Sequence, residues 1–529
     1  MGISHARSAT FFALLLLGCE GVIGGGEPLE PNQLDDSMPP RTGSELDGGI
    51  GAIPDLGSTP DAGVAPPAPP PDCNPATTPL LPARALRLSA VTINQSVSIP
   101  IVDDAAAVSS RGAPVVAERA GVLRVFVDPQ PAWQPREIIA RLTVNGQARD
   151  ERRQITGSSS QGSLDSTINF ALDPGELAED SDYSVQLLEL DPCGAYAGDA
   201  EETRFPSSND ASLGVDANPG AFRIVLVPVR YQVDGSTVEP TVDGSTIERF
   251  EDRMRALYPV TDLEISIRQT PLDFDRTLGP DGEGWVDLLS ECLSLRVDDG
   301  ASPNTYYYCA IRPTIDASEF CSQGCIAGLG PVPSASDLIN RAAIGLLYEN
   351  GVGTFVHEIG HTLGLFHAPC GGVSGADPDF PYSDGRIGAP GFDVSAQEIL
   401  DTEHRDIMSY CGPAWISDYH YALLYERLVA VTAQSAMALK QAANPVAARP
   451  VIVEVDGSLT IGNPIRLDAW PEGEELIVQW LDRAGTSRDL PATLVRVSHL
   501  PGGIIYVPEM EQAPSAIRVP GYGTAVPRR

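Results

Sequence analysis

The sequence of 529 residues is poor in basic side chains: 35 lysines and arginines stand against 71 aspartates and glutamates, which gives a formal net charge of -36. Nucleic acid would be repelled by so acidic a protein, so we exclude it as a partner. Beyond its first residues the chain also lacks an apolar run long enough to span a bilayer as a helix. The length predicts about three domains.

The first residues are predicted to be a targeting signal and not part of the fold. Arg7 precedes an apolar run, 11–17, that is too short to span a bilayer. The following Leu16-Leu17-Gly18-Cys19 resembles a bacterial lipobox, whose cysteine is lipidated and becomes the mature N-terminus. We therefore expect residues 1–19 to be a lipoprotein signal peptide, with Cys19 as a lipid anchor at the cell surface or outer membrane. A plain secretory signal is the alternative, and both interpretations predict export.

Composition and periodicity divide the rest of the chain into four segments. Residues 20–82 are rich in proline and glycine and predict a disordered tether. Residues 83–215 contain short strand patterns, which predict a β-sandwich of immunoglobulin-like kind. Residues 218–443 alternate strand and helix patterns and predict an α/β domain. Residues 446–529 predict a small β domain whose function the sequence does not indicate.

The expected elements follow from the same patterns. In 218–443 we predict strands at 222–229, 263–268, 305–312, 326–332 and 341–347, and helices at 246–258 and 285–293. A further helix is expected to carry the histidines described below. In the preceding segment, Asn145-Gly146 is the turn signal of a β-hairpin.

Apart from Cys19, eight cysteines remain, and this even number favours four disulfides in an exported chain. Cys321 and Cys325 have the spacing of half a structural zinc site, but the sequence contains no second such pair, so zinc is not expected there. We favour Cys73 as the disulfide partner of Cys193.

The chemistry is concentrated in the run His357-Glu358-Ile359-Gly360-His361-Thr362-Leu363-Gly364-Leu365-Phe366-His367. On a helix, His357 and His361 lie one turn apart on the same face and can bind one ion. Glu358 can reach a water on that ion. Gly364 can adopt positive φ, so the helix can end there and His367 can come round as a third ligand. Three neutral imidazoles leave a fourth position for water, which is the catalytic arrangement of zinc.

This run matches in full the extended zinc signature of the metzincin peptidases, His-Glu-x-x-His-x-x-Gly-x-x-His, and the chain resembles that family over residues 220–435. Asp406-Ile407-Met408-Ser409-Tyr410 resembles the family's second hallmark, a methionine-containing turn below the metal. The resemblance implies one catalytic zinc and a central α/β metzincin domain, with Met408 packed below the ligands. It also implies that Tyr410 stabilises the oxyanion of the reaction, although a merely packed aromatic is the alternative.

Two further stretches, 381–388 and 415–419, resemble secreted bacterial metzincins that include mucin-cleaving enzymes. Position 368 departs from the family pattern, because Ala368 stands where several subfamilies have a characteristic residue. The subfamily and the substrate class therefore stay open.

The same resemblance predicts a disulfide between Cys370 and Cys411, because the third histidine and the methionine turn meet at the metal in metzincins. Closing a loop of about 40 residues could stabilise the fold by roughly 3–4 kcal/mol. The alternative is that either cysteine pairs elsewhere, for example with Cys321 or Cys325. If a cysteine kept the enzyme latent by binding the metal, Cys73 would be the candidate.

We therefore predict a monomeric zinc endopeptidase that hydrolyses extracellular proteins or glycoproteins, with Glu358 as the general base. An extended substrate is expected to pair with a strand edge, for which 326–332 is the candidate. Two other functions stay open. One is a surface adhesin or binding module that keeps the fold without turnover, against which the intact Glu358 argues. The other is a zinc amidase that acts on cell-wall peptides.

Calcium is a possible second ion, but the sequence does not support it. The spacing of the candidate carboxylates fits no standard calcium loop, so we interpret them as solvated loop residues. The carboxylates in question are Asp377, Asp379, Asp384 and Asp393.

Overall fold

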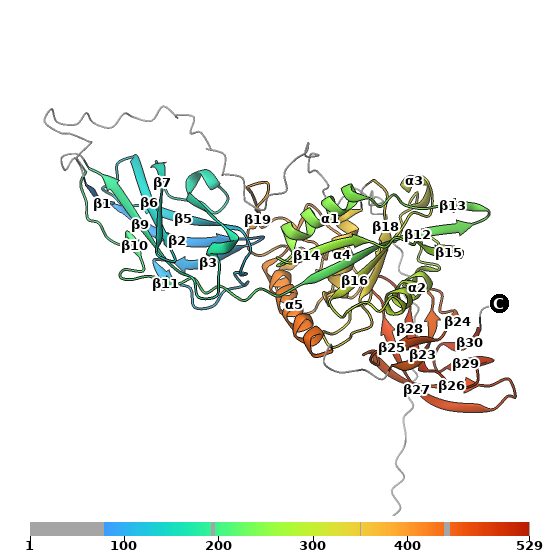
Figure 1. The fold of residues 1–529 in the computed structure, drawn as a ribbon. Helices are drawn as coiled ribbons and strands as arrows, with labels where there is room; N and C mark the ends of the chain where they lie inside the picture. Colours follow the sequence, from blue (N-terminus) through green and yellow to red (C-terminus); the bar gives the residue numbers. More distant parts are fainter. Residues whose placement is uncertain (1–78, 192–195, 350, 439–444, 528–529) are drawn as a thin grey trace, which may run out of the picture.

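A computed structural model describes residues 79–191, 196–349, 351–438 and 445–527. Three parts follow one another along the chain, and the longer helices lie in the middle part (Figure 1). Cys19, Cys73 and Cys193 lie outside the described residues, so the signal peptide, the lipid anchor and the Cys73–Cys193 pairing stay predictions. Within the described ranges, no helix combines the length and apolar character needed to cross a membrane.

The N-terminal part consists of two antiparallel sheets around a common core. One sheet has the order β1 (Leu80–Pro82), β9 (Asp182–Leu190), β6 (Arg136–Val144) and β7 (Gln147–Ile155), with β10 (Arg204–Phe205) and β11 (Ala211–Ser212) also paired to β9. The other has the order β4 (Ala106–Ala107), β3 (Ser98–Asp103), β2 (Leu86–Asn94), β5 (Gly121–Pro129) and β8 (Ile168–Leu172). Val91, Val125 and Leu142, drawn from both sheets, belong to one buried cluster. The immunoglobulin-like character of this part stays a prediction.

Two local predictions can be compared with this part. Asn145 and Gly146 both have positive φ between β6 and β7, so the predicted hairpin turn is confirmed. The predicted tether is wrong at its end, because Leu80 to Pro82 form β1 and pair with the edge of β9. Proline is tolerated on an edge strand, so a proline-rich composition did not exclude pairing there.

The middle part contains a mixed sheet with the order β13 (Ser236–Val238), β12 (Phe222–Val233), β16 (Thr305–Ile311), β18 (Ala342–Leu346) and β17 (Gly328–Leu329), and β14 (Leu263–Ile267) and β15 (Leu272–Phe274) also pair with β12. Strands β12, β16 and β18 are parallel, and β17 is antiparallel to β18. The predicted strand 326–332 is therefore shorter than expected. Pro331 and Pro333 lack the N–H groups that a longer strand would need.

Helices cover both faces of this sheet, because side chains alternate along its strands. Tyr306 and Tyr308 of β16 pack on the face of α1 (Gly244–Leu257) and α4 (Val352–Thr362). Tyr307 and Cys309 face the other way, toward α2 (Trp285–Asp298). The predicted helices 246–258 and 285–293 are thus confirmed, although α2 continues five residues further, to Asp298. The remaining elements are α3 (Ala317–Phe320), β19 (Gly391–Asp393), β20 (Glu398–Leu400), β21 (Arg405–Asp406), β22 (Ala414–Trp415) and α5 (Asp418–Ala438).

The C-terminal part is one sheet in the order β24 (Leu459–Ile461), β30 (Gly523–Pro527), β29 (Ala516–Val519), β26 (Glu474–Leu481), β27 (Ser487–Arg496), β28 (Gly503–Pro508), β23 (Val446–Val453) and β25 (Ile465–Leu467). Because β24 pairs with both β30 and β23, the sheet closes into a small barrel. Ile452, Ile465 and Tyr506 pack into the same buried cluster as α2, so the barrel lies directly against the middle part (Figure 1).

Three disulfides lie within the described residues. They join Cys292 to Cys309, Cys321 to Cys325, and Cys370 to Cys411. Cys321 and Cys325, whose spacing is that of half a zinc site, are thus paired with each other. Disulfides are typical of proteins in oxidising compartments, which agrees with an extracellular protein.

Candidate metal centre

Helix α4 carries His357, Glu358 and His361, and its buried face lies in the core of the middle part. On that face Gly360 contacts the methionine turn: a Cβ added there would lie 2.6 Å from the Met408 sulfur. Glycine therefore allows the helix to rest directly on Met408. The helix ends at Thr362, and Gly364 then adopts a φ of +87° that other residues adopt only at a cost.

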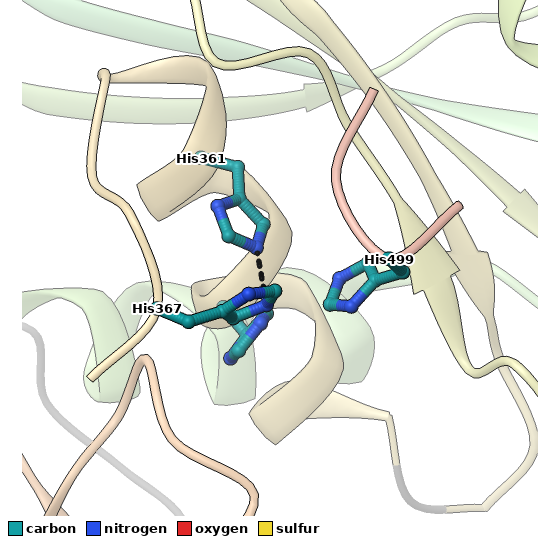
Figure 2. Close-up of side chains that lie close together, drawn as sticks. His361, His367 and His499 are labelled. Atoms are coloured by element: carbon teal, nitrogen blue, oxygen red, sulfur yellow. Dashed lines mark hydrogen bonds between the residues drawn. The ribbon is translucent and has the colours of Figure 1, made fainter. Parts of the chain in front are cut away.

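The turn at Gly364 brings His367 beside the two helical histidines. The Nε2 atoms of His361 and His367 are 3.1 Å apart (Figure 2). All three rings are nearly buried, with exposed fractions of 6% for His357, 1% for His361 and 3% for His367. The structure thus brings together the three residues that the sequence predicted as ligands.

The hydrogen bond that each ring makes through Nδ1 determines where the ring carries its proton. Each Nδ1 lies 2.7–2.8 Å from a backbone carbonyl, which can only accept a hydrogen bond. The proton of each neutral ring therefore sits on Nδ1, and the lone pair of each Nε2 faces the common centre. The carbonyl partners are those of Ile407, Leu365 and Ser374.

A cation accounts for this arrangement. Two lone pairs 3.1 Å apart repel each other, and the buried Nε2 of His357 has no hydrogen-bond partner among the described residues. Burial lowers the pKa of His357 and of His367 to about 4, and that of His361 well below its usual range. Neutral imidazoles oriented by carbonyls are the form in which histidine binds metals. These three residues therefore fit a metal ion.

The methionine turn is held by a buried pair that the sequence analysis did not identify. The Asp406 carboxylate accepts hydrogen bonds from His420 Nδ1 at 2.8 Å and from the backbone N–H of Met408 at 2.7 Å. Burial raises the pKa of Asp406, but the charge and hydrogen bond of His420, together with hydrogen bonds from Ser417 and Met408, outweigh it, and the net shift is downward. The Asp406–His420 pair therefore holds the methionine turn in place. This turn also orients His357, because the carbonyl of Ile407 accepts the hydrogen bond of the His357 ring.

The predicted disulfide between Cys370 and Cys411 is confirmed, with a Cα separation of 5.8 Å. The carbonyl of Cys370 also accepts the backbone N–H of Tyr410 at 3.1 Å, and the carbonyl of Met408 accepts that of Ala368 at 3.0 Å. The segment after His367 therefore lies directly against the methionine turn.

Glu358 is nearly buried at the opening of the site. A Cβ added to Gly328 of β17 would lie 2.5 Å from the Cγ of Glu358, so the strand lies directly on this side chain. Burial raises the pKa of Glu358 to about 8, against a smaller opposite effect of His357. Tyr410 also lies beside the histidines, and its ring centroid is 5.2 Å from that of His367.

A fourth histidine, which the sequence analysis missed, completes the cluster. His499 follows β27 of the C-terminal barrel, and its ring points toward the other three (Figure 2). One ring nitrogen from each of the four histidines lies within 4.8 Å of the others. The only feature of the sequence that could have drawn attention to His499 is that histidine is rare in this chain, which has seven of them. Nothing in the residues around His499 resembles a ligand motif.

Two of the four carboxylates considered for calcium, Asp377 and Asp393, have hydrogen-bond partners within the protein. Asp377 accepts a hydrogen bond from the Tyr419 hydroxyl at 2.9 Å, and Asp393 accepts the backbone N–H groups of Ser395 and Ala396 at 2.8 and 2.9 Å. These bonds are those of loop-stabilising side chains.

Comparisons with known proteins were made against families, curated sequences and solved structures. No curated protein matches the sequence. Among solved structures, metalloproteinase-II from Bacteroides fragilis is similar at 12% identity and a TM-score of 0.25, over 63% of this chain and 87% of that one. The family described as Peptidase M66 matches residues 342–413. This stretch contains the three clustered histidines together with Glu358 and Tyr410, so the match and the buried cluster together support a metallopeptidase.

Proposed function

We propose that the protein is a zinc endopeptidase of the metzincin type that acts on extracellular proteins or glycoproteins. The observation that carries this proposal is the convergence of three neutral, carbonyl-anchored imidazoles on one centre next to a buried carboxylate. Three histidines are a ligand set of catalytic zinc, whereas magnesium and calcium prefer oxygen ligands.

His357, His361 and His367 would hold the ion. Zinc bound there would supply a Lewis acid and a water that loses its proton near neutral pH. Glu358 would accept that proton and pass it to the leaving amine. The hydroxyl of Tyr410 would donate a hydrogen bond to the developing oxyanion.

The substrate would bind as an extended strand. Strand β17 lies at one end of the central sheet and covers Glu358, so a peptide paired to that edge would pass directly over the proposed base. The chemical nature of the substrate side chains is not indicated by any residue in the site.

Glu358→Gln and His361→Ala separate the two proposed roles. Glu358→Gln is expected to keep one zinc per chain but to lower metal-dependent cleavage of a peptide library by several orders of magnitude, because the water loses its base. His361→Ala is expected to lose the zinc, measured by elemental analysis. His404→Ala, which removes an imidazole from a surface loop, is the control and should retain both properties. Cleavage by purified Glu358→Gln at the wild-type rate would contradict the assignment, and cleavage of cell-wall peptides alone would favour the amidase.

We also propose that the enzyme is a monomer held at the cell surface by a lipid on Cys19. The lipobox-like run before this residue supports the anchor. The wild-type protein should partition into detergent and take up a fatty-acid label, and Cys19→Ala should do neither. A soluble, unlabelled wild-type protein would rule the anchor out.

A further inference from the structure

We propose that residues 497–499 of the C-terminal barrel are an internal inhibitor of the peptidase site. In this proposal His499 is a fourth metal ligand, and Val497 and Ser498 occupy the strand edge that an extended substrate would need. The inference rests on the proposed peptidase function and adds its regulation.

The position of His499 supports the first element of the proposal. Its Nε2 lies 3.1 Å from Oε1 of Glu358, and its Nδ1 is hydrogen-bonded to the hydroxyl of Tyr410. The ring centroids of His367 and His361 are 4.7 and 5.1 Å away. His499 therefore lies between the proposed base, the proposed oxyanion donor and the metal ligands, where water and the scissile carbonyl would have to bind.

Backbone pairing supports the second element. Val497 forms an antiparallel bridge with Pro331, which continues the line of β17. The N–H of Ser498 donates to the carbonyl of Gly330 at 2.8 Å, and the N–H of Gly330 donates to the Ser498 hydroxyl at 3.1 Å. An extended peptide that adds to a sheet edge forms the same kind of bonds. The inhibitory segment thus uses the groups that a substrate would use.

The backbone at His499 forms a tight turn that is anchored by its neighbours. Its φ is +60°, in the left-handed region, which histidine adopts more readily than most non-glycine residues. The preceding Val497 is buried and packs in the cluster that joins the barrel to α2. The loop is therefore held on the site by a rigid domain and is not an exposed tip that happens to touch it.

The chemical consequence follows from the number of ligands. Four imidazoles around one ion form a closed set, as in structural sites, whereas a catalytic site keeps one position open. While His499 is bound, neither the water nor the substrate carbonyl has a position, so the wild type would cleave peptides only in the fraction of molecules whose loop is withdrawn. Peptide cleavage would then require withdrawal of the loop, by displacement or cleavage of the C-terminal part.

The test uses the full-length protein loaded with cobalt(II), whose visible spectrum reports the ligand number. His499→Gly removes the imidazole while glycine keeps the positive φ. His499→Asn is a second variant, because asparagine also tolerates this backbone, and His404→Ala is the matched histidine control. Acetohydroxamate, a small chelating ligand, probes whether a coordination position is open.

We expect acetohydroxamate to leave the spectra of the wild type and His404→Ala unchanged and to shift those of both His499 variants. Apparent cobalt affinity, measured by competition with a chelator, should fall on the order of tenfold or more when an imidazole ligand is lost. Peptide cleavage by the zinc forms of the His499 variants should rise at least tenfold above the wild type. Adding Glu358→Gln to His499→Gly should abolish that gain.

Identical spectra and equal acetohydroxamate binding in wild type and His499→Gly would overturn the inference and leave the proposed function intact. Lower cleavage by both His499 variants at unchanged metal affinity would also overturn it, because His499 would then assist the reaction. A wild-type protein that binds no cobalt or zinc would instead refute the proposed function itself.

Discussion

Gly360 allows helix α4, which carries two of the histidines, to pack closely against Met408. In most exposed helix interiors alanine is about 1 kcal/mol more favourable than glycine. At position 360, however, a Cβ would lie 2.6 Å from the Met408 sulfur and 3.2 Å from the Tyr258 hydroxyl, both in a packed core. We expect Gly360→Ala to destabilise the protein by about 1–3 kcal/mol in denaturant unfolding, because overpacking outweighs helix propensity.

The same substitution at Gly244 is the control, since its added Cβ would meet nothing within 4 Å. Gly244→Ala should be neutral or slightly stabilising. If Gly360→Ala were equally harmless, the methionine turn would have to be more adaptable than its packing indicates.

Some residues of the site could be predicted from the sequence, and one could not. His357, Glu358 and His361 are predictable because one helix fixes their relation, and His367 because Gly364 allows the turn. His499 could not be predicted in this way. Its contacts with the others depend on the docking of a separate sheet, and no local pattern encodes that docking.

At the scale of elements, two disulfides close loops of very different length. Cys370–Cys411 spans a sequence separation of 41, and Cys321–Cys325 one of 4. By loop entropy, loss of the first should cost about 4 kcal/mol and loss of the second about 2 kcal/mol. We expect the double serine variants to show this order in denaturant unfolding. A larger loss for the short loop would mean that local contacts, and not chain entropy, decide the effect.

Elements were predictable where periodicity alone determines them. The apolar run within 305–312 predicts a strand, and the structure has one at Thr305–Ile311. The predicted 326–332 strand is cut to Gly328–Leu329 because prolines interrupt its hydrogen bonding. Part of the missing pairing is supplied by Val497, which is distant in the sequence and so invisible to a local pattern.

At the scale of the whole molecule, a half-buried carboxyl lies between the barrel and the middle part. Glu454 accepts the backbone N–H of Gly284, at the start of α2, at 3.1 Å. Burial raises its pKa to about 7, and that hydrogen bond only partly opposes the shift. The folded state therefore holds an extra proton between the ordinary value of 4.5 and about 7, so stability is lost as pH rises through this window.

Glu454→Gln should remove that loss, because the amide stays neutral and can still accept the N–H of Gly284. We expect the variant to be more stable than wild type by about 1–3 kcal/mol at pH 8 and by much less at pH 5, measured by denaturant unfolding. Glu511→Gln, at an exposed position, should show no such pH dependence. An equal effect of Glu454→Gln at both pH values would contradict the protonation argument.

The N-terminal part and the middle part share one buried cluster, and a buried arginine adds hydrogen bonds between them. The guanidinium of Arg119 donates to the carbonyls of Val260 at 2.9 Å and Arg255 at 2.6 Å, and to the Ser96 hydroxyl at 2.7 Å. Burial lowers its pKa, and the contacts are with neutral oxygens, so the side chain joins the two parts by hydrogen bonds and not by an ion pair. Trp415, which follows the methionine turn, adds a bond to the carbonyl of Ser96 at 2.8 Å.

Arg119→Met should therefore weaken the coupling between the two parts. It leaves the carbonyls of Arg255 and Val260 without their donor, at a cost of about 1–3 kcal/mol for each buried group. Arg124→Met is the matched control, because Arg124 is also buried but donates to carbonyls within its own part, including those of Gln161 and Ser163. We expect calorimetry to resolve two transitions in Arg119→Met, with the middle part near its wild-type temperature, whereas Arg124→Met should lower the N-terminal part without changing how the parts are coupled. A single, uniformly shifted transition in Arg119→Met would mean that the remaining contacts, such as that of Trp415, suffice to hold the interface.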